Sequence, residues 1–265
     1  MQTLALVMTL GALIGLVMAL TGAGGGVLAI PLLVFGLHLP VQQAAPVGLV
    51  AVGLAAVLGA TLGLRQGIVR YRAALLMGLA GMLTAPLGVL LARHLPNRPL
   101  MGAFALVLML SAWRMLKRPA LPDVQPDGVP CQVSLVDHRL TWTLPCARAL
   151  AGTGLLSGLM SGLLGVGGGF VIIPALTRYT DLNPRSIQRT SLAVIALVSL
   201  SGVTAAAIHG SLPWEIARSF ALGAVVALLA GQALAGKLDD KHLQPAFAWL
   251  TLVVALLMLA RSAGA

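Results

Sequence analysis

The sequence predicts an all-α integral membrane protein with about eight transmembrane helices, arranged as two four-helix repeats. Hydrophobic residues make up 58% of the 265 residues and charged residues only 9%, whereas a soluble domain carries about 25% charged residues. The charges are also clustered, since residues 1–64 contain no Asp, Glu, Lys or Arg. A third observation is a Gly-Gly-Gly block that occurs once in each half of the chain.

Long apolar runs separated by short polar ones predict the individual helices. A spanning helix needs roughly 20 apolar residues, and a soluble core would explain one such run but not a series of them. Two shorter apolar pieces, 26–37 and 169–178, follow the first and fifth spans. The predicted spans are residues 3–23, 43–64, 72–92, 99–117, 148–165, 187–208, 215–236 and 243–261.

A polar, proline-rich segment divides the chain. We expect a first transmembrane repeat at 1–117, a linker at 118–147 and a second repeat at 148–265. Cys131 and Cys146 flank the centre of the linker. A disulfide between them requires that the linker face an oxidising compartment, and two free thiols are the favoured expectation.

The two halves share a sequence pattern. GLVMALTGAGGGVLAIP at 15–31 aligns without gaps to GLMSGLLGVGGGFVIIP at 158–174, with nine of 17 positions identical. Repeated halves are common in secondary transporters, whose substrate site lies at the repeat interface. Four spans per half imply two repeats in the same orientation. If one short apolar piece also crosses the membrane, the count is odd and the repeats are inverted.

The distribution of charge suggests an orientation and argues against nucleic acid as a partner. The formal net charge is +10, but the basic residues are scattered between apolar runs, as in loops that flank membrane helices. With eight spans, Lys and Arg are slightly more frequent on the side that holds the termini and the linker. The positive-inside rule then places both termini and the linker in the cytoplasm.

The glycine blocks are the first candidate for a binding site. Consecutive glycines destabilise a helix, so each block predicts a broken helix whose new N-terminus offers backbone amides to an anion. Pro31 and Pro174 follow the blocks and would reinforce each break. Close helix packing through small residues is the alternative. The candidate binding residues in these blocks are Gly24, Gly25, Gly26, Gly167, Gly168 and Gly169.

The second candidate is a cluster of polar residues that opens the sixth span. Arg189, Thr190 and Ser191 could also bind an anion, whereas the aligned residues of the first half are the less polar Pro46-Val47-Gly48. The alternative is a capped helix start with an arginine that reaches the membrane surface. Hydroxyls of Thr21, Ser157 and Ser161 near the glycine blocks could contribute, or could form interhelical hydrogen bonds.

Other chemistry has little support in the sequence. The acidic residues lie outside the centres of the predicted spans, which disfavours a cation site or a proton relay inside the membrane. We find no arrangement typical of a catalytic or metal site, and GAGGGV lacks the Lys-Ser/Thr that completes a phosphate-binding loop. We therefore expect neither enzyme activity nor a cofactor or metal.

The chain resembles the sulfite exporter TauE/SafE family of membrane permeases. The resemblance rests mainly on SGLLGVGGGFVIIP at 161–174 and on Thr190-Ser191, and it covers nearly the whole chain. It implies a multi-pass protein of the bacterial inner membrane. Some members are implicated in the export of sulfite, sulfoacetate or related organosulfur anions.

The main functional hypothesis is a secondary transporter that exports small anions by alternating access between its halves. Sulfite and organosulfonates are the expected substrates. A channel-like pore without energy coupling and an accessory subunit of a membrane complex are the alternatives. The expected partners are the anion and the lipid bilayer, without nucleic acid, and a homo-oligomer stays open.

Overall fold

The computed structural model describes residues 2–21, 26–117, 130–131, 143–235 and 240–264. Within these ranges the chain is helical, apart from turns and one isolated β-bridge between Cys131 and Thr180. The helices, in chain order, are α1 (Gln2–Thr21), α2 (Ala29–Gly36), α3 (Val41–Arg65), α4 (Tyr71–His94), α5 (Asn97–Lys117), α6 (Leu144–Leu164), α7 (Gly169–Tyr179), α8 (Pro184–Ile208), α9 (Trp214–Ala235) and α10 (Asp240–Gly264).

The predicted helix positions are confirmed. Each predicted span coincides with one of the eight long helices, and the two short apolar pieces are α2 and α7. Helix α6 begins at Leu144, so the last residues of the predicted linker belong to a helix. Of the described helices, five are long and apolar enough to cross a membrane, namely α3, α4, α6, α8 and the Trp214–Gly231 part of α9.

The outer surface of these helices is apolar. Along α4, Leu79, Leu83 and Leu87 are 56%, 74% and 56% exposed, and their spacing of four residues places them on one face of the helix. A continuous apolar face of this kind marks a surface that contacts lipid or another protein. The observation supports the assignment to a membrane.

Helices α6 and α7 form a hairpin that turns back on itself. Cys131 is bonded to Cys146 at the start of α6, and its backbone N–H donates to the Tyr179 carbonyl oxygen at the end of α7. The two outer ends of the hairpin therefore lie together. Helix α2 likewise returns beside α1, since Gly36 at its end packs against Leu10.

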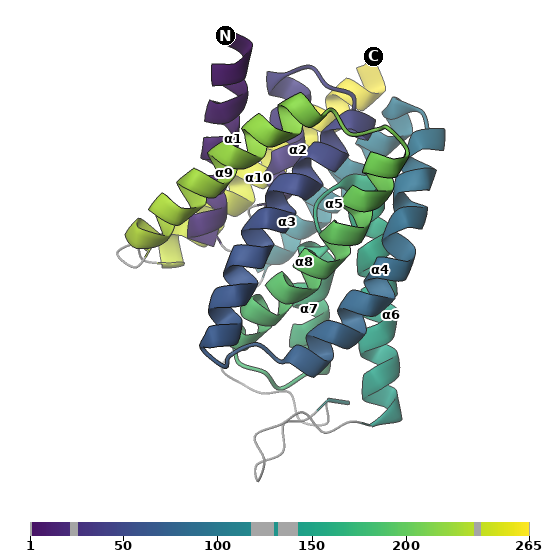
Figure 1. Cartoon of the computed structure of the whole chain (residues 1–265), viewed down its shortest axis with the longest axis vertical. Coiled ribbons are helices and arrows are strands. Elements are labelled where there is room, and N and C mark those ends of the chain that lie inside the picture. Colours follow the sequence, from purple (N-terminus) through teal and green to yellow (C-terminus); the bar gives the residue numbers. More distant parts are fainter. Residues whose placement is uncertain (1, 22–25, 118–129, 132–142, 236–239, 265) are drawn as a thin grey trace.

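The chain termini and the described part of the linker lie at opposite ends of the molecule. Both chain termini lie at one end, here called the terminus end, while the start of α6 lies at the opposite end, here called the linker end (Figure 1). Cys131 is bonded to Cys146 in the first turn of α6 and therefore lies at the linker end as well. The expectation that termini and linker share one side is therefore wrong. The physical reason is that α1–α2 and α6–α7 turn back, so neither helix pair carries the chain across to the opposite end.

Contacts between helices recur with the offset that aligns the two glycine blocks. Gly11 of α1 packs against the Phe220 carbonyl of α9, and Gly154 of α6 packs against the Met77 carbonyl of α4. Residues 11 and 154 are 143 positions apart, as are 77 and 220. The hairpin of each half thus packs on a helix of the other half.

The aligned helices α3 and α8 run antiparallel. Gly59 of α3 packs against the Leu192 side chain of α8, and Gly202 of α8 packs against Leu49 of α3. These two contacts are also related by the offset of 143. Because equivalent helices point in opposite directions, the two halves have opposite orientations in the fold.

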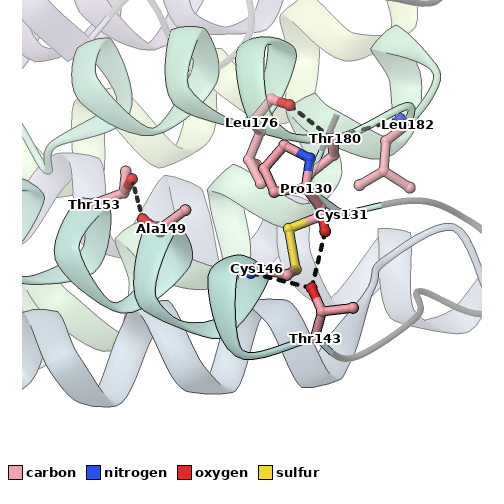
Figure 2. The surroundings of a disulfide bond; sticks show 9 residues. All are labelled: Pro130, Cys131, Thr143, Cys146, Ala149, Thr153, Leu176, Thr180 and Leu182. Atoms are coloured by element: carbon pink, nitrogen blue, oxygen red, sulfur yellow. Dashed lines mark hydrogen bonds between the residues drawn. A yellow bond between two sulfur atoms is a disulfide. The ribbon is translucent and has the colours of Figure 1, made fainter. Parts of the chain in front are cut away.

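A disulfide fastens the described part of the linker to the helical hairpin. The sulfurs of Cys131 and Cys146 are joined, and both residues are fully buried, so the favoured expectation of two free thiols is wrong for this structure. Thr143 caps α6 by accepting a hydrogen bond from the Cys146 amide, and its hydroxyl donates to the Pro130 carbonyl oxygen. Figure 2 shows the two bonds meeting beside the disulfide.

Candidate functional site

The turn between α6 and α7 has a backbone that favours glycine. Gly165, Gly167 and Gly168 have φ angles of +73°, +74° and +73°, in the left-handed region that costs other residues roughly 1–2 kcal/mol. Gly165 ends α6, and its amide donates to the Ser161 carbonyl oxygen at 2.7 Å. The second glycine block therefore forms a tight turn between helices, as the sequence predicts for a helix break.

Three buried serine hydroxyls surround this turn. The distances are measured to the position that a Cβ atom would take on each glycine. Ser157 Oγ touches that position on Gly168, and Ser199 Oγ lies 3.7 Å from that position on Gly167. Ser161 is one helical turn before Gly165. Ser157 and Ser161 are fully buried and Ser199 is 1% exposed. None of the three hydroxyls has a hydrogen-bond partner among the described residues.

The N-terminus of α7 adds backbone donors to the same place. Gly168 is the N-cap of α7 and supplies no side-chain hydrogen bond. The first amides of a helix have no carbonyl partner within it, and they form the positive end of the helix dipole. The turn thus combines amides at the start of an 11-residue helix with hydroxyls from α6 and α8.

Part of the first glycine block lies near the second block, and the Val52 side chain separates them. Val52 of α3 lies within 3.0 Å of a Cβ built on Gly167 and within 2.8 Å of one built on Gly26. Gly24 and Gly25 lie outside the described residues. The two blocks therefore approach each other across Val52, near the centre of α3.

The two predicted helix-breaking prolines do not stand at breaks. Pro31 lies in the first turn of α2 and Pro174 lies inside α7, and each short helix continues past its proline. A proline is tolerated in a first turn because that amide has no partner in any case. The chain turns at glycines instead.

The predicted cluster at the start of α8 serves another contact. Arg189 Nη1 donates to the Gly59 carbonyl oxygen at 3.2 Å, and Thr190 Oγ1 accepts from the Arg70 amide at 3.1 Å. Ser191 Oγ donates to Gln188 of its own helix. These residues precede Ser199 by eight to ten positions, which is about 12–15 Å along a helix. They lie toward the linker end and not at the glycine turn.

The glycine turn is neutral and rich in donors. The described acidic side chains are Asp181 and Glu215, which lie next to helix starts. In the described part of the chain, no group of three His, Cys, Asp or Glu residues is placed to hold a metal. The site therefore offers amide and hydroxyl donors without a nearby carboxylate, which suits a small anion better than a cation.

Sequence reasoning missed two members of this site, Ser199 and Gly165. Ser199 lies eight positions beyond Ser191 on α8, which is a little more than two helical turns. A helical-wheel comparison of the hydroxyls on α8 would have placed both on the same broad face. Gly165 stands in the quoted glycine-rich motif, but its left-handed backbone depends on the direction in which α7 returns.

Comparison with known proteins finds membrane proteins that are similar to this chain. The profile of the sulfite exporter TauE/SafE family matches residues 7–258. Two probable membrane transporter proteins from strains of Xylella fastidiosa are 28% and 29% identical, and each alignment covers 98% of this chain and 97% of the relative. A probable membrane transporter protein of Methanocaldococcus jannaschii is 25% identical over 76% of this chain and 71% of its own length. No solved structure matches the chain.

Proposed function

Because the chain belongs to the sulfite exporter TauE/SafE family, we propose that it exports small sulfur-containing anions, either sulfite or organosulfonates. The protein is a membrane transporter by family, and the family name supplies sulfite as the reference substrate. The binding site is the α6–α7 turn with Ser157, Ser161 and Ser199. The first glycine block approaches this site from the other half of the chain.

The observation that carries the proposal is the set of three buried hydroxyls without partners. A buried polar group that lacks a hydrogen bond costs roughly 1–3 kcal/mol. A helical serine can avoid that cost by bonding a carbonyl of the preceding turn, as Ser191 and Ser219 do here. Thr153 of α6 does the same, donating to Ala149 at 2.7 Å. The three serines around the glycine turn lack such a bond, which is explained if their hydroxyls donate hydrogen bonds to a bound substrate.

The chemistry of the donors fits an oxyanion. Sulfite and sulfonate groups present several oxygens that accept hydrogen bonds from hydroxyls and from the first amides of α7. Neutral donors bind an anion without a buried counter-charge. This matters for a transporter, because a fully paired buried charge would resist release into water.

The opposite orientation of the two halves supports alternating access. In transporters with inverted repeats, one set of helices rocks against the other around a central site. Here the turn lies between α6, α8 and α3, and α3 and α8 come from different halves. We infer that relative movement of α3 and α8 exposes the site to one membrane face at a time.

The test uses serine-to-alanine variants in proteoliposomes loaded with labelled sulfite. Ser161→Ala and Ser199→Ala should lower efflux at least about tenfold, the effect of losing one hydrogen bond to a charged group. Their thermal unfolding in detergent should stay at the wild-type midpoint or rise, because each change removes a buried group without a partner. Unchanged efflux in both variants would contradict the proposed site.

Ser201→Ala is the matched control. Ser201 is on α8 close to Ser199, but its hydroxyl donates to the Met82 carbonyl oxygen at 2.8 Å. Its removal should lower the unfolding midpoint and leave sulfite efflux close to normal. The opposite signs of the stability changes separate a binding role from a structural one.

A further inference from the structure

The two ends of the substrate path are closed in different ways. The relevant places are the starts of α3 and α8, because these helices are aligned in sequence and antiparallel in space. The start of α3 lies near the terminus end, and the start of α8 lies near the linker end (Figure 1). Residues 46 and 189 are equivalent by the offset of 143, and they are Pro46 and Arg189.

At the linker end, side-chain hydrogen bonds tie α8 to α3 and to the turn between α3 and α4. Arg189 donates to Gly59, Thr190 accepts from the Arg70 amide, and Ser186 Oγ donates to the Ile68 carbonyl oxygen at 3.0 Å. The stem of Arg189 also packs on Gly63. This set of contacts, here called the linker-end latch, joins α8 to α3 and to the α3–α4 turn.

At the terminus end, the equivalent place holds a small pocket. Its walls include Pro46 and Leu49 of α3, Gly162 of α6, and Ser211, which is the equivalent of Ile68. Pro46 and its neighbour Val47 cannot reproduce the bonds of Arg189 and Thr190, because neither has a side-chain donor or acceptor. The cavity volume is about 10 Å³, which is room for about one water molecule.

The pocket lies beside the glycine turn and has a positively charged residue in its wall. Gly162 is next to Ser161, and Ala45 of the pocket wall touches Gly165 of the turn. Arg93 lines the pocket and is exposed. An arginine at the mouth of a narrow passage raises the local concentration of anions.

We propose that the anion passes between the serine site and the terminus end through the pocket beside Pro46, while the linker-end latch formed by Arg189 is the gate that closes the opposite end. The inference rests on the proposed function, since it assumes that the glycine turn binds the substrate. Opening at the terminus end requires only the separation of small apolar contacts. Opening at the linker end requires the breaking of the Arg189 bond.

The test measures the accessibility of two equivalent leucines. Leu49→Cys and Leu192→Cys are introduced separately into a chain whose native cysteines are replaced by serine. Right-side-out and inside-out vesicles are treated with a small membrane-impermeant thiol reagent. Leu49 is fully buried and Leu192 is partly exposed in this conformation, so the labelling rates report how often each end opens to water. We expect the Leu49 variant to react at least about tenfold faster, and only from the terminus side, since one charge-assisted bond shifts an opening equilibrium by about that factor.

The gate is then opened by mutation. Arg189→Ala should raise the labelling of Leu192→Cys about tenfold and lower that of Leu49→Cys. Arg185→Ala is the control, because Arg185 is exposed one turn earlier on α8 and should change neither rate. Equal labelling of the two leucine variants, or rates that Arg189→Ala leaves unchanged, would overturn the proposal.

Labelling needs no substrate, so this experiment is independent of the flux assay. If the labelling follows the expectation and no anion is transported, the gate stands and the proposed substrate class fails. If sulfite is transported and the labelling is symmetric, the proposed function stands and the gate fails.

Discussion

Two glycines with similar backbone angles have different roles. Gly168 and Gly210 have φ angles of +73° and +67°, but only Gly168 has close neighbours. A Cβ at Gly168 would collide with Ser157, whereas one at Gly210 would have no atom within 4 Å. Comparing substitutions at Gly168 and Gly210 therefore separates two effects on stability, namely the strain of a left-handed backbone and the clash of an added side chain.

We expect Gly168→Ala to lower the free energy of unfolding by about 2–5 kcal/mol, the sum of a left-handed backbone and an overpacked contact. Gly210→Ala should cost only about 1–2 kcal/mol. Chemical unfolding in detergent, followed by circular dichroism, measures both. Gly168→Ala should also reduce sulfite efflux, because it displaces Ser157. Equal losses of stability would show that space at Gly168 is unimportant.

At this scale, the sequence predicted the residue types but not all of their positions. The second glycine block was predicted as a break because three glycines disfavour a helix, and the structure has a turn there. The cluster at Arg189 was assigned to the same site because it follows the block closely in sequence. The chain first returns through α7, which carries that cluster toward the linker end.

Helix packing depends on glycines at the crossings of α6 with α4 and of α1 with α9. Gly158 of α6 faces the Gly81 backbone, and Gly15 of α1 faces the Ala224 carbonyl. Residues 15 and 158 are the equivalent glycines that open the two aligned blocks. Close packing through small residues was weighed as an alternative to breakage for the glycine triplets. The structure shows such packing at these other glycines of α1 and α6.

A matched pair on α6 tests this packing. We expect Gly158→Ala to lower the free energy of unfolding by at least about 1–3 kcal/mol, because the new methyl group would meet backbone atoms that cannot move aside. Gly152→Ala should raise it by up to about 1 kcal/mol, since nothing lies within 4 Å of that Cβ. Thermal unfolding midpoints in one detergent measure the difference. A stable Gly158→Ala protein would argue against close contact of α4 and α6.

Helix positions were predictable and helix directions were not. An apolar run of about 20 residues is visible in any sequence window, so the eight long helices were found. Whether a short piece such as α2 or α7 crosses the membrane or returns depends on the turn before it. At Gly165–Gly168, three glycines with left-handed backbone angles set the direction of α7. An average of hydropathy over a stretch of sequence contains no information on backbone angles.

The whole molecule has unequal ends. At the linker end, the α3–α4 turn, the start of α6 and the α7–α8 turn carry the arginines 65, 70, 72, 148, 178, 185 and 189, while the terminus end carries the arginines 93, 98, 218 and 261. Basic residues near membrane helices concentrate on the cytoplasmic side. The disulfide at the linker end favours the opposite orientation, with the linker end outside the cytoplasm, because disulfides persist in oxidising compartments.

We expect the arginine pattern to decide the orientation, because it sums over several turns. The linker end then faces the cytoplasm and the termini face outward. Alkaline phosphatase fused after Ala265 should be active. The Cys131–Cys146 disulfide of this structure should then be reduced in growing cells. Because both residues are fully buried in the fold, they should react with a permeant maleimide once the protein is unfolded in its presence. An inactive fusion together with cysteines that resist the maleimide would reverse the orientation.

The exchange of helices between the halves bears on how the protein is made. Helix α1 enters the bilayer first, yet the backbone on which Gly11 and Gly15 rest belongs to α9, some 200 residues later in the chain. At roughly 5–20 residues per second, synthesis needs about 10–40 seconds to reach it. During that interval the face of α1 that packs on α9 lacks its native neighbour, although the first hairpin already meets α3 through Gly26 and Val52. The nascent protein therefore depends on the insertion machinery or on lipid to cover that face. Assembly is therefore completed only when translation is nearly over.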